Sequence, residues 1–262
     1  MTGAASMADL LPLLPLGIMA GLLSGLVGIG GGLVFSPLLL ALGLDPHQAL
    51  ATSTMAIVPT TLGGTTAHLR SRSLPLKGSI GIGAAALLAA LLFSRMGRLM
   101  EGWHLLSLQA LMYVLLALSI RSADGERGEI PGPGMAQPIL GLAGVGAVAG
   151  FAGGLLGLGG GLVMVPLMVR GLTLPIHLAI RFSTLAVACS ASGASLQFLS
   201  QGRGLPATAL ILGGTAALAA QWSASRMDRV SGPRLAGILR GLAVLLALDS
   251  GRRALSLLLS GA

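Results

Sequence analysis

The sequence predicts an all-α integral membrane protein made of two tandem homologous repeats, each with about four helical elements. Of its 262 residues, 54% are hydrophobic and only 9% are charged, whereas a soluble domain is about 25% charged. Three stretches carry no charged side chain: 10–44, 78–94 and 130–169. A run of about 18 such residues is a candidate membrane span. A glycine-rich motif also occurs once in each half.

The two copies of this motif define the repeat. Residues 27–40 read "VGIGGGLVFSPLLL", and residues 156–169 read "LGLGGGLVMVPLMV", an offset of 129 residues from Val27 to Leu156. Two further pairs keep this offset within two residues: "HQALATSTMA" (47–56) with "HLAIRFSTLA" (177–186), and "SRMGR" (94–98) with "SRMDR" (225–229). We therefore expect a first transmembrane repeat at 1–120, a polar linker at 121–138 and a second transmembrane repeat at 139–262.

Each repeat is expected to open with a broken apolar segment and to continue with three helices. In the first repeat these elements are expected near 11–42, 47–69, 78–96 and 103–120, and in the second near 138–169, 176–200, 206–226 and 234–250. A straight helix over 11–42 would rise about 48 Å, although a hydrocarbon core is only about 30 Å thick. Because glycine disfavours helix interiors, we expect a break at the glycine motif. With this break, the apolar segment forms either a kinked membrane span or a re-entrant hairpin.

The arginines and lysines outside the apolar runs favour the hairpin. Kinked spans give eight crossings and divide these cations eight to six between the two membrane faces. Re-entrant hairpins leave three crossings in each half, invert the second half and divide the cations nine to five. Cytoplasmic loops carry an excess of positive charge. The sequence therefore favours inverted repeats, with the linker 121–138 in the cytoplasm.

The glycine breaks are candidate binding sites for an anion. Unwound glycines within a membrane leave backbone N–H groups free, and the start of the next helix carries partial positive charge. Two such breaks on a pseudo-symmetry axis would form one cradle, made by Gly30, Gly31, Gly32, Gly159, Gly160 and Gly161. The alternative role for small residues is close helix packing, and we expect that role for Gly17, Gly21 and Gly25.

The doubled pattern "G-x-G-G-G-x-x-x-x-P", followed in each half by "H-x-A-x-x-x-S-T", resembles the sulfite exporter TauE/SafE family of membrane permeases. The resemblance covers nearly the whole chain. It implies a secondary transporter that moves sulfite, an organosulfonate or another small sulfur-containing anion across the bacterial inner membrane, as a multi-pass protein. In this family a small residue and Thr commonly precede the serine. Ala51 and Thr52 fit that pattern, but Arg181 and Phe182 depart from it, so we expect a specialised second half of the site.

Arg181 is the charged residue inside one motif copy, "LAIRFSTLA". Charge within an apolar helix is unfavourable and is usually functional, and a guanidinium can bind an oxyanion through two parallel hydrogen bonds. The alternative is an arginine that reaches out to the lipid headgroups. We list Arg181 as a candidate substrate ligand.

Hydroxyl and amide side chains complete the candidate substrate site. These residues are Ser53, Thr54, Thr65, Ser183, Thr184 and Gln197. For the hydroxyl groups, the alternative is a hydrogen bond to the carbonyl four residues earlier in the helix. His68 lies on the same helix face as Thr65, and we list it as a candidate for proton coupling.

Other classes of function are disfavoured by what the sequence lacks. An intramembrane enzyme needs paired acids or a Ser/His pair at membrane depth, and apart from Asp249 no acidic residue lies in the apolar runs. The single cysteine, Cys189, excludes a multi-cysteine metal site. We therefore expect neither catalysis nor a bound metal or cofactor. We also expect no nucleic acid partner, although the net charge is +8. The expected partners are a small anion and the bilayer. A homo-oligomer, an anion channel and a non-transporting scaffold stay open.

Overall fold

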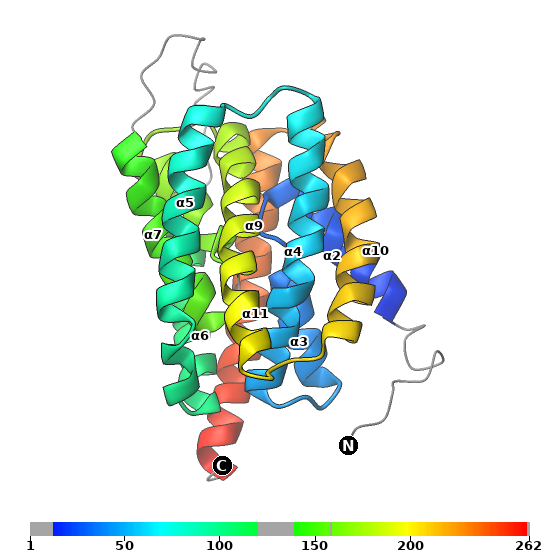
Figure 1. Cartoon of the computed structure of the whole chain (residues 1–262), viewed down its shortest axis with the longest axis vertical. Coiled ribbons are helices and arrows are strands. Elements are labelled where there is room, and N and C mark those ends of the chain that lie inside the picture. Colours follow the sequence, from blue (N-terminus) through cyan, green and yellow to red (C-terminus); the bar gives the residue numbers. More distant parts are fainter. Residues whose placement is uncertain (1–12, 120–138, 158, 261–262) are drawn as a thin grey trace.

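The protein is a bundle of helices in a computed structural model that describes residues 13–119, 139–157 and 159–260 (Figure 1). The linker expected at 121–138 lies outside the described residues. The first half contains α2 (Leu13–Val27), α3 (Gly32–Ala41), α4 (Pro46–Arg70), α5 (Leu76–Phe93) and α6 (Gly102–Ser119). The second half contains α7 (Ile139–Leu156), α8 (Gly161–Pro166), α9 (Ile176–Ser200), α10 (Pro206–Ala224) and α11 (Gly232–Ser260). Short 3-10 turns at Met96–Leu99 and Met227–Arg229 precede α6 and α11, and a π-helical turn at Leu167–Gly171 extends α8.

Most helices begin and end where the sequence predicts, because the local start signals are clear. Asp45 caps α4 by accepting a hydrogen bond from the Gln48 N–H at 3.0 Å, and Pro46 occupies the first turn, where proline is tolerated. The last helix was expected to end at residue 250, but α11 continues to Ser260. Asp249 lies inside it and pairs with Arg253 at 2.9 Å. This i,i+4 pair supports the extra turns.

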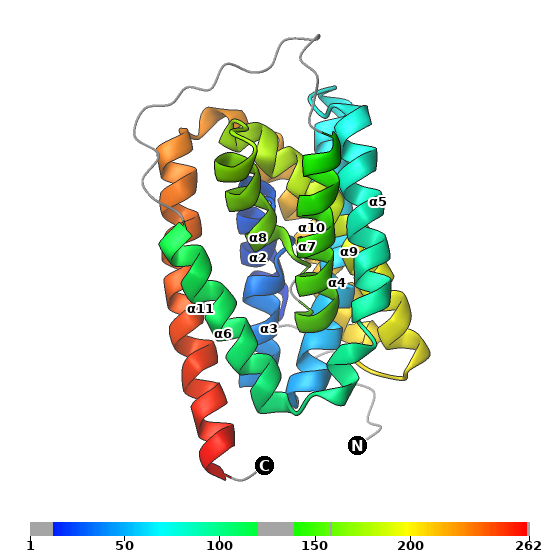
Figure 2. The same cartoon turned by 90° about the vertical axis from the view of Figure 1, so that its left-hand side faces the viewer.

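Each glycine break turns the chain back, so the opening segment is a hairpin and not a kinked helix. Ser53, two turns into α4, donates to the Gly32 carbonyl at the start of α3, at 3.4 Å. The far end of α3 connects to the start of α4, and α3 therefore runs antiparallel to α4. α2 runs parallel to α10, since Gly21 lies against Ala216 and Gly25 against Ala220. α4 also runs parallel to α10, since Ala56 lies against Gly213 and Gly63 against Ala217, so α3 runs antiparallel to α2 as well. The second half contains the same hairpin in α7 and α8 (Figure 2).

Small residues let helices from opposite halves pack closely. In α2, Gly17, Gly21 and Gly25 lie against the backbone of α10 at Leu212, Ala216 and Ala220. In α7, Gly146, Gly150 and Gly154 lie against the backbone of α5 at Ile82, Ala86 and Ala90. The packing role expected for the first three glycines is confirmed. Each contact in the first set matches one in the second at an offset of 129 or 130 residues.

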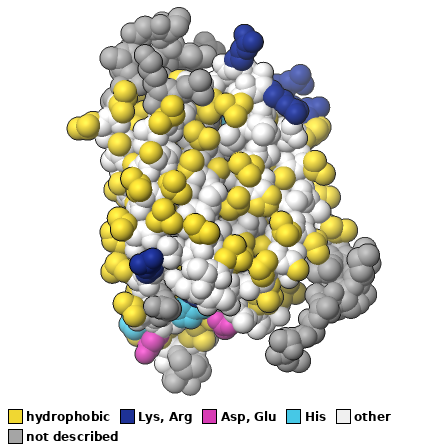
Figure 3. All heavy atoms as spheres, viewed as in Figure 1, with side chains coloured by type: hydrophobic (Ala, Val, Ile, Leu, Met, Phe, Trp, Pro, Cys, Tyr) yellow, Lys and Arg dark blue, Asp and Glu magenta, His cyan; other side chains and the backbone are white. Residues whose placement is uncertain are grey.

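The outer surface of the bundle is apolar around its middle. Large side chains such as Leu140 (91% exposed) and Leu218 (73% exposed) point outward, whereas soluble proteins bury most residues of this kind. Figure 3 shows hydrophobic side chains across the face of the bundle, with charged and histidine side chains near its ends. By length and composition, α7 and α9 could each cross a membrane, and several shorter helices are equally apolar. The surface therefore fits a lipid environment.

Candidate functional site

The two glycine breaks adopt a backbone conformation that other residues rarely reach. Gly28, Gly30 and Gly31 have φ angles of 72°, 80° and 77°. In the second break, Gly157, Gly159 and Gly160 have φ angles of 66°, 70° and 72°. Positive φ is accessible to glycine without steric cost, and two adjacent residues in this region reverse the chain direction. This requirement explains why the most flexible residues interrupt the most apolar segments.

The structure brings the two breaks together at the centre of the bundle. A Cβ atom added at Gly161 would lie 2.8 Å from the Gly28 carbonyl oxygen and 2.8 Å from the Ile29 Cα atom. Gly30 and Gly159 both face Val187, and a Cβ at either would lie 2.7 Å from its side chain. Gly30, Gly159 and Gly161 thus lie together around Val187 and form one backbone surface, whereas an added Cβ at Gly31 would face Phe35 and one at Gly160 would face Ala149.

Backbone N–H groups lie at this surface at the start of a helix. The turn residues Gly30 and Gly31 lead into α3, which begins at Gly32, and the first amides of a helix have no partner within the helix. The breaks are also fully enclosed by protein, since residues 28–33 and 159–161 are all buried. Buried N–H groups at a helix start can bind an anion that enters.

The four hydroxyl residues lie at the breaks and hold them in place. Ser183 donates to the Gly28 carbonyl at 2.8 Å, and Thr54 donates to the Gly157 carbonyl at 2.9 Å. Ser53 reaches the Gly32 carbonyl, while Thr184 bonds within its own helix to the Ile180 carbonyl at 2.8 Å. In this conformation these hydroxyls bind protein carbonyls. Three of them connect α4 or α9 to a glycine break.

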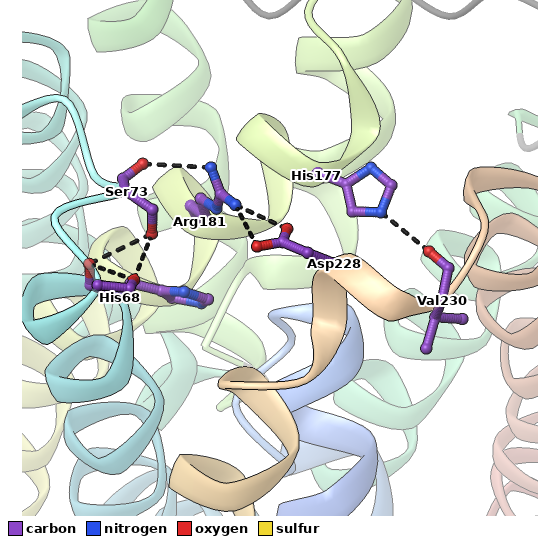
Figure 4. A network of polar contacts seen from close by, with 7 residues as sticks. His68, Ser73, His177, Arg181, Asp228 and Val230 are labelled. Atoms are coloured by element: carbon purple, nitrogen blue, oxygen red, sulfur yellow. Dashed lines mark hydrogen bonds and ion pairs between the residues drawn. The ribbon is translucent and has the colours of Figure 1, made fainter.

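The remaining candidates lie away from the breaks, at the two ends of the bundle. Arg181 and His68 lie toward one end, where the start of α9 meets the end of α4 (Figure 4). Thr65, one turn before His68, is 4% exposed, and its hydroxyl has no partner among the described residues. Gln197 lies near the end of α9 and accepts a hydrogen bond from Arg95 at 3.3 Å. Gln197 is thus separated from the other candidates.

Arg181 is held by an acidic residue that the sequence analysis missed. Its Nη2 atom lies 2.7 and 2.8 Å from the two Asp228 carboxylate oxygens, and its Nη1 atom donates to the Ser73 carbonyl at 3.3 Å. Asp228 is the residue that distinguishes "SRMDR" from "SRMGR", and that difference was the available signal. Ser190 was also missed. It donates to the Gly159 carbonyl at 2.9 Å and stands at the position equivalent to Thr60.

Replacing Ser183 by alanine should destabilise the protein by about 1–3 kcal/mol, because it leaves the buried Gly28 carbonyl without its donor. The matched control is Ser192→Ala, since Ser192 bonds only within its own helix, to the Ala188 carbonyl. Unfolding of both purified variants by denaturant in detergent would measure the difference. Equal midpoints would show that Ser183 does not hold the break.

The chain was compared with known proteins. The family model of the sulfite exporter TauE/SafE matches residues 13–249. The probable membrane transporter protein YunE of Bacillus subtilis (strain 168) is 28% identical over 72% of this chain and 78% of its own. A probable membrane transporter protein of Xylella fastidiosa (strain 9a5c) is 30% identical over 65% and 67%. Sulfite exporter TauE/SafE family protein 3 of Arabidopsis thaliana is 49% identical, over 16% of this chain and 9% of its own. No solved structure matches significantly.

Proposed function

Because this chain belongs to the sulfite exporter TauE/SafE family, we propose that it is a secondary transporter for a small sulfur-containing anion such as sulfite or an organosulfonate. That it is a membrane transporter is supported by the family and by the names of its relatives. The substrate class is carried over from the family's description. No ATP-binding motif occurs in the sequence, so an ion or substrate gradient supplies the energy for uphill transport.

The proposed architecture is a pair of inverted repeats. It is supported by the matched contacts of α2 with α10 and of α7 with α5, and by the antiparallel course of α4 and α9. Gly28 lies against Ile180 and Thr184, and Gly157 lies against Leu50 and Thr54, at the same offset. Two inverted halves around one site permit alternating access, because each half can adopt the conformation of the other.

The proposed substrate site is the surface where the two glycine breaks meet. The contact between the two buried glycine breaks, the first of which leads into the start of α3, is the observation that carries the proposal. The N–H groups at the start of α3 would bind the anion, and the partial positive charge of the helix terminus favours it. The hydroxyls of Ser53 and Ser183 donate to carbonyls at the breaks in this conformation, and they would donate to the bound oxyanion instead. Gln197 lies outside this site.

The proposed location is the bacterial inner membrane, with the linker 121–138 on the cytoplasmic side. The nine-to-five division of cations supports this orientation. Among the described residues, Arg70, Arg170 and Arg229 lie at the same end of the bundle as the start of α7, whereas Arg95 and Arg252 lie at the other. The apolar belt supplies the lipid-facing surface.

Transport by purified protein in liposomes tests this function. We expect saturable entry of radiolabelled sulfite, and faster entry when unlabelled sulfite is enclosed within the liposomes. Such counterflow is a property of a carrier, whereas a channel gives entry that does not saturate in this way. Liposomes without protein, and competition by chloride, are the controls. Failure of counterflow with both sulfite and sulfoacetate would rule out the proposed carrier, and unsaturable flux would favour the anion channel.

A further inference from the structure

The Arg181–Asp228 ion pair joins one buried partner to one exposed partner. The Arg181 side chain is 12% exposed, but that of Asp228 is 67% exposed. Arg181 belongs to the long helix α9 and is held by the Ser73 carbonyl, whereas Asp228 lies on the three-residue turn between α10 and α11. The turn is itself held to α9, because the His177 ring lies 3.0 Å from the Val230 carbonyl oxygen and Met227 is buried, so the exposed Asp228 side chain is the part of this contact that can turn into water.

Among the described residues, the end of the bundle opposite the Arg181–Asp228 pair has no corresponding ion pair. The positions equivalent to Arg181 and Asp228 in the first half are Ala51, at an offset of 130, and Gly97, at an offset of 131. Both charges are therefore replaced together by small residues at the opposite end. Since the first half folds into corresponding helices without these charges, the fold itself does not require the pair. In the described part of the chain, the presence of the pair at one end alone indicates a function specific to that end.

Three buried polar atoms near the pair lack hydrogen-bond partners among the described residues. They are the Arg181 Nε, the His68 Nε2 and the Thr65 Oγ1 atoms. His68 is 3% exposed and Thr65 is 4% exposed. Buried polar groups are normally paired, so each unpaired one requires an explanation such as a bound water or ion. The Ser195 hydroxyl, at the position equivalent to Thr65, is also unpaired among the described residues, so the unpaired atoms specific to this end are those of Arg181 and His68. Figure 4 shows the His68 ring on the same side as the Arg181–Asp228 pair.

These atoms lie along a path from the ion pair to the glycine breaks. Gly64, next to Thr65, lies against the Thr184 side chain, and Thr184 in turn lies near Gly28. Arg181 is one turn from Thr184 along α9, and His68 is one turn from Gly64 along α4. The two helices run antiparallel, so both turns lead toward the same end of the bundle.

We propose that Arg181 with His68 and Thr65 forms an entry site for the substrate's oxyanion, and that Asp228 occupies this site and closes that end when no substrate is bound. A sulfonate or sulfite presents two oxygens to a guanidinium in the same geometry as a carboxylate. The arriving anion takes the place of the Asp228 carboxylate, and the exposed Asp228 side chain turns into water. This inference rests on the proposed transport of a small oxyanion.

The closure is tested by accessibility, without any substrate. In a Cys189→Ala background, the Thr65→Cys variant reports the Arg181 end, and the Ser195→Cys variant reports the equivalent position at the other end. Reaction of each with a water-soluble maleimide is measured in nanodiscs. Adding Asp228→Asn should increase the labelling rate at position 65 roughly tenfold or more and should not increase it at position 195. Asp228→Glu, which keeps the carboxylate, should retain slow labelling at position 65.

Two further results would decide the proposal. If Asp228→Asn leaves the labelling rate at position 65 unchanged, the pair does not close this end, even if sulfite transport is intact. If Asp228→Asn accelerates labelling equally at both positions, the substitution has loosened the whole fold and the closure is also overturned. For the oxyanion site, Asp228→Asn should tighten sulfite binding, because it removes the competing carboxylate. Weaker binding would contradict competition between Asp228 and substrate.

Discussion

The Gly28→Ala variant is expected to lose about 2–5 kcal/mol of stability and to yield less folded, transporting protein. Gly28 has a φ angle of 72°, which costs an L-amino acid about 1–2 kcal/mol. A Cβ atom there would also lie 2.6 Å from the Ile180 carbonyl oxygen, and forcing extra atoms into a packed core costs about 1–3 kcal/mol more. The sum is a large fraction of the about 5–15 kcal/mol that stabilises a typical protein.

Three other glycines separate the two causes of this destabilisation, which are the positive φ angle and the crowding of an added Cβ atom. Gly43 has a φ angle of 87° with no atom within 4 Å of an added Cβ, so Gly43→Ala tests the backbone conformation alone. Gly161 has no positive φ but would bring its Cβ 2.8 Å from the Gly28 carbonyl oxygen, so Gly161→Ala tests crowding alone. Gly214, inside α10, also has open space, and Gly214→Ala should be neutral or slightly stabilising.

The measurement is the fraction of protein that elutes as a single species in detergent, followed by its thermal midpoint and by sulfite counterflow. We expect the order of stability to be Gly214→Ala, then Gly43→Ala, then Gly161→Ala, with Gly28→Ala last. The equivalent substitution Gly157→Ala should behave like Gly28→Ala, because its Cβ would lie 2.8 Å from the Leu50 carbonyl oxygen. A Gly28→Ala variant as stable as Gly214→Ala would contradict this account of the break.

The helices and the two breaks were predictable because they depend on local signals. Apolar runs, Pro46 and the glycine clusters each act within a few residues, so the elements matched the structure closely. The end of α11 was not predictable in this way. The Gly251, Arg252 and Arg253 sequence is typical of a helix exit, but the pair between Asp249 and Arg253 continues the helix.

The course of the hairpins and the partner of Arg181 depend on contacts between distant segments. Composition gave only a preference of nine cations to five for the hairpin, whereas the Ser53 to Gly32 hydrogen bond fixes the direction of α3. Asp228 is 47 residues from Arg181 along the chain, and no local pattern connects them. The likeness of the paired segments contained the missing clue, since Ala51 and Gly97 stand where Arg181 and Asp228 would be expected in the first half.

Arg181→Ala is expected to weaken sulfite binding by roughly ten- to a hundred-fold, because a hydrogen bond to a charged group contributes about 1.5–3 kcal/mol. Arg181→Lys keeps the charge but not the two-pronged geometry, and it should lose part of that affinity. The matched control is Arg70→Ala, at an exposed position on the same end of the bundle. Arg203 is a poor control, since it contacts His47 at 2.9 Å and lies over the Phe198 ring.

Binding to the purified variants by calorimetry, with the thermal midpoint measured in parallel, separates loss of a ligand from loss of the fold. Arg181→Ala also leaves Asp228 without its partner, but Asp228 is 67% exposed and water can solvate it. The substitution should therefore weaken sulfite binding strongly and change the thermal midpoint only slightly. If Arg181→Ala binds sulfite as tightly as the parent, Arg181 serves only to hold Asp228. Recognition of the anion must then depend on the glycine amides and on the hydroxyls of Ser53 and Ser183.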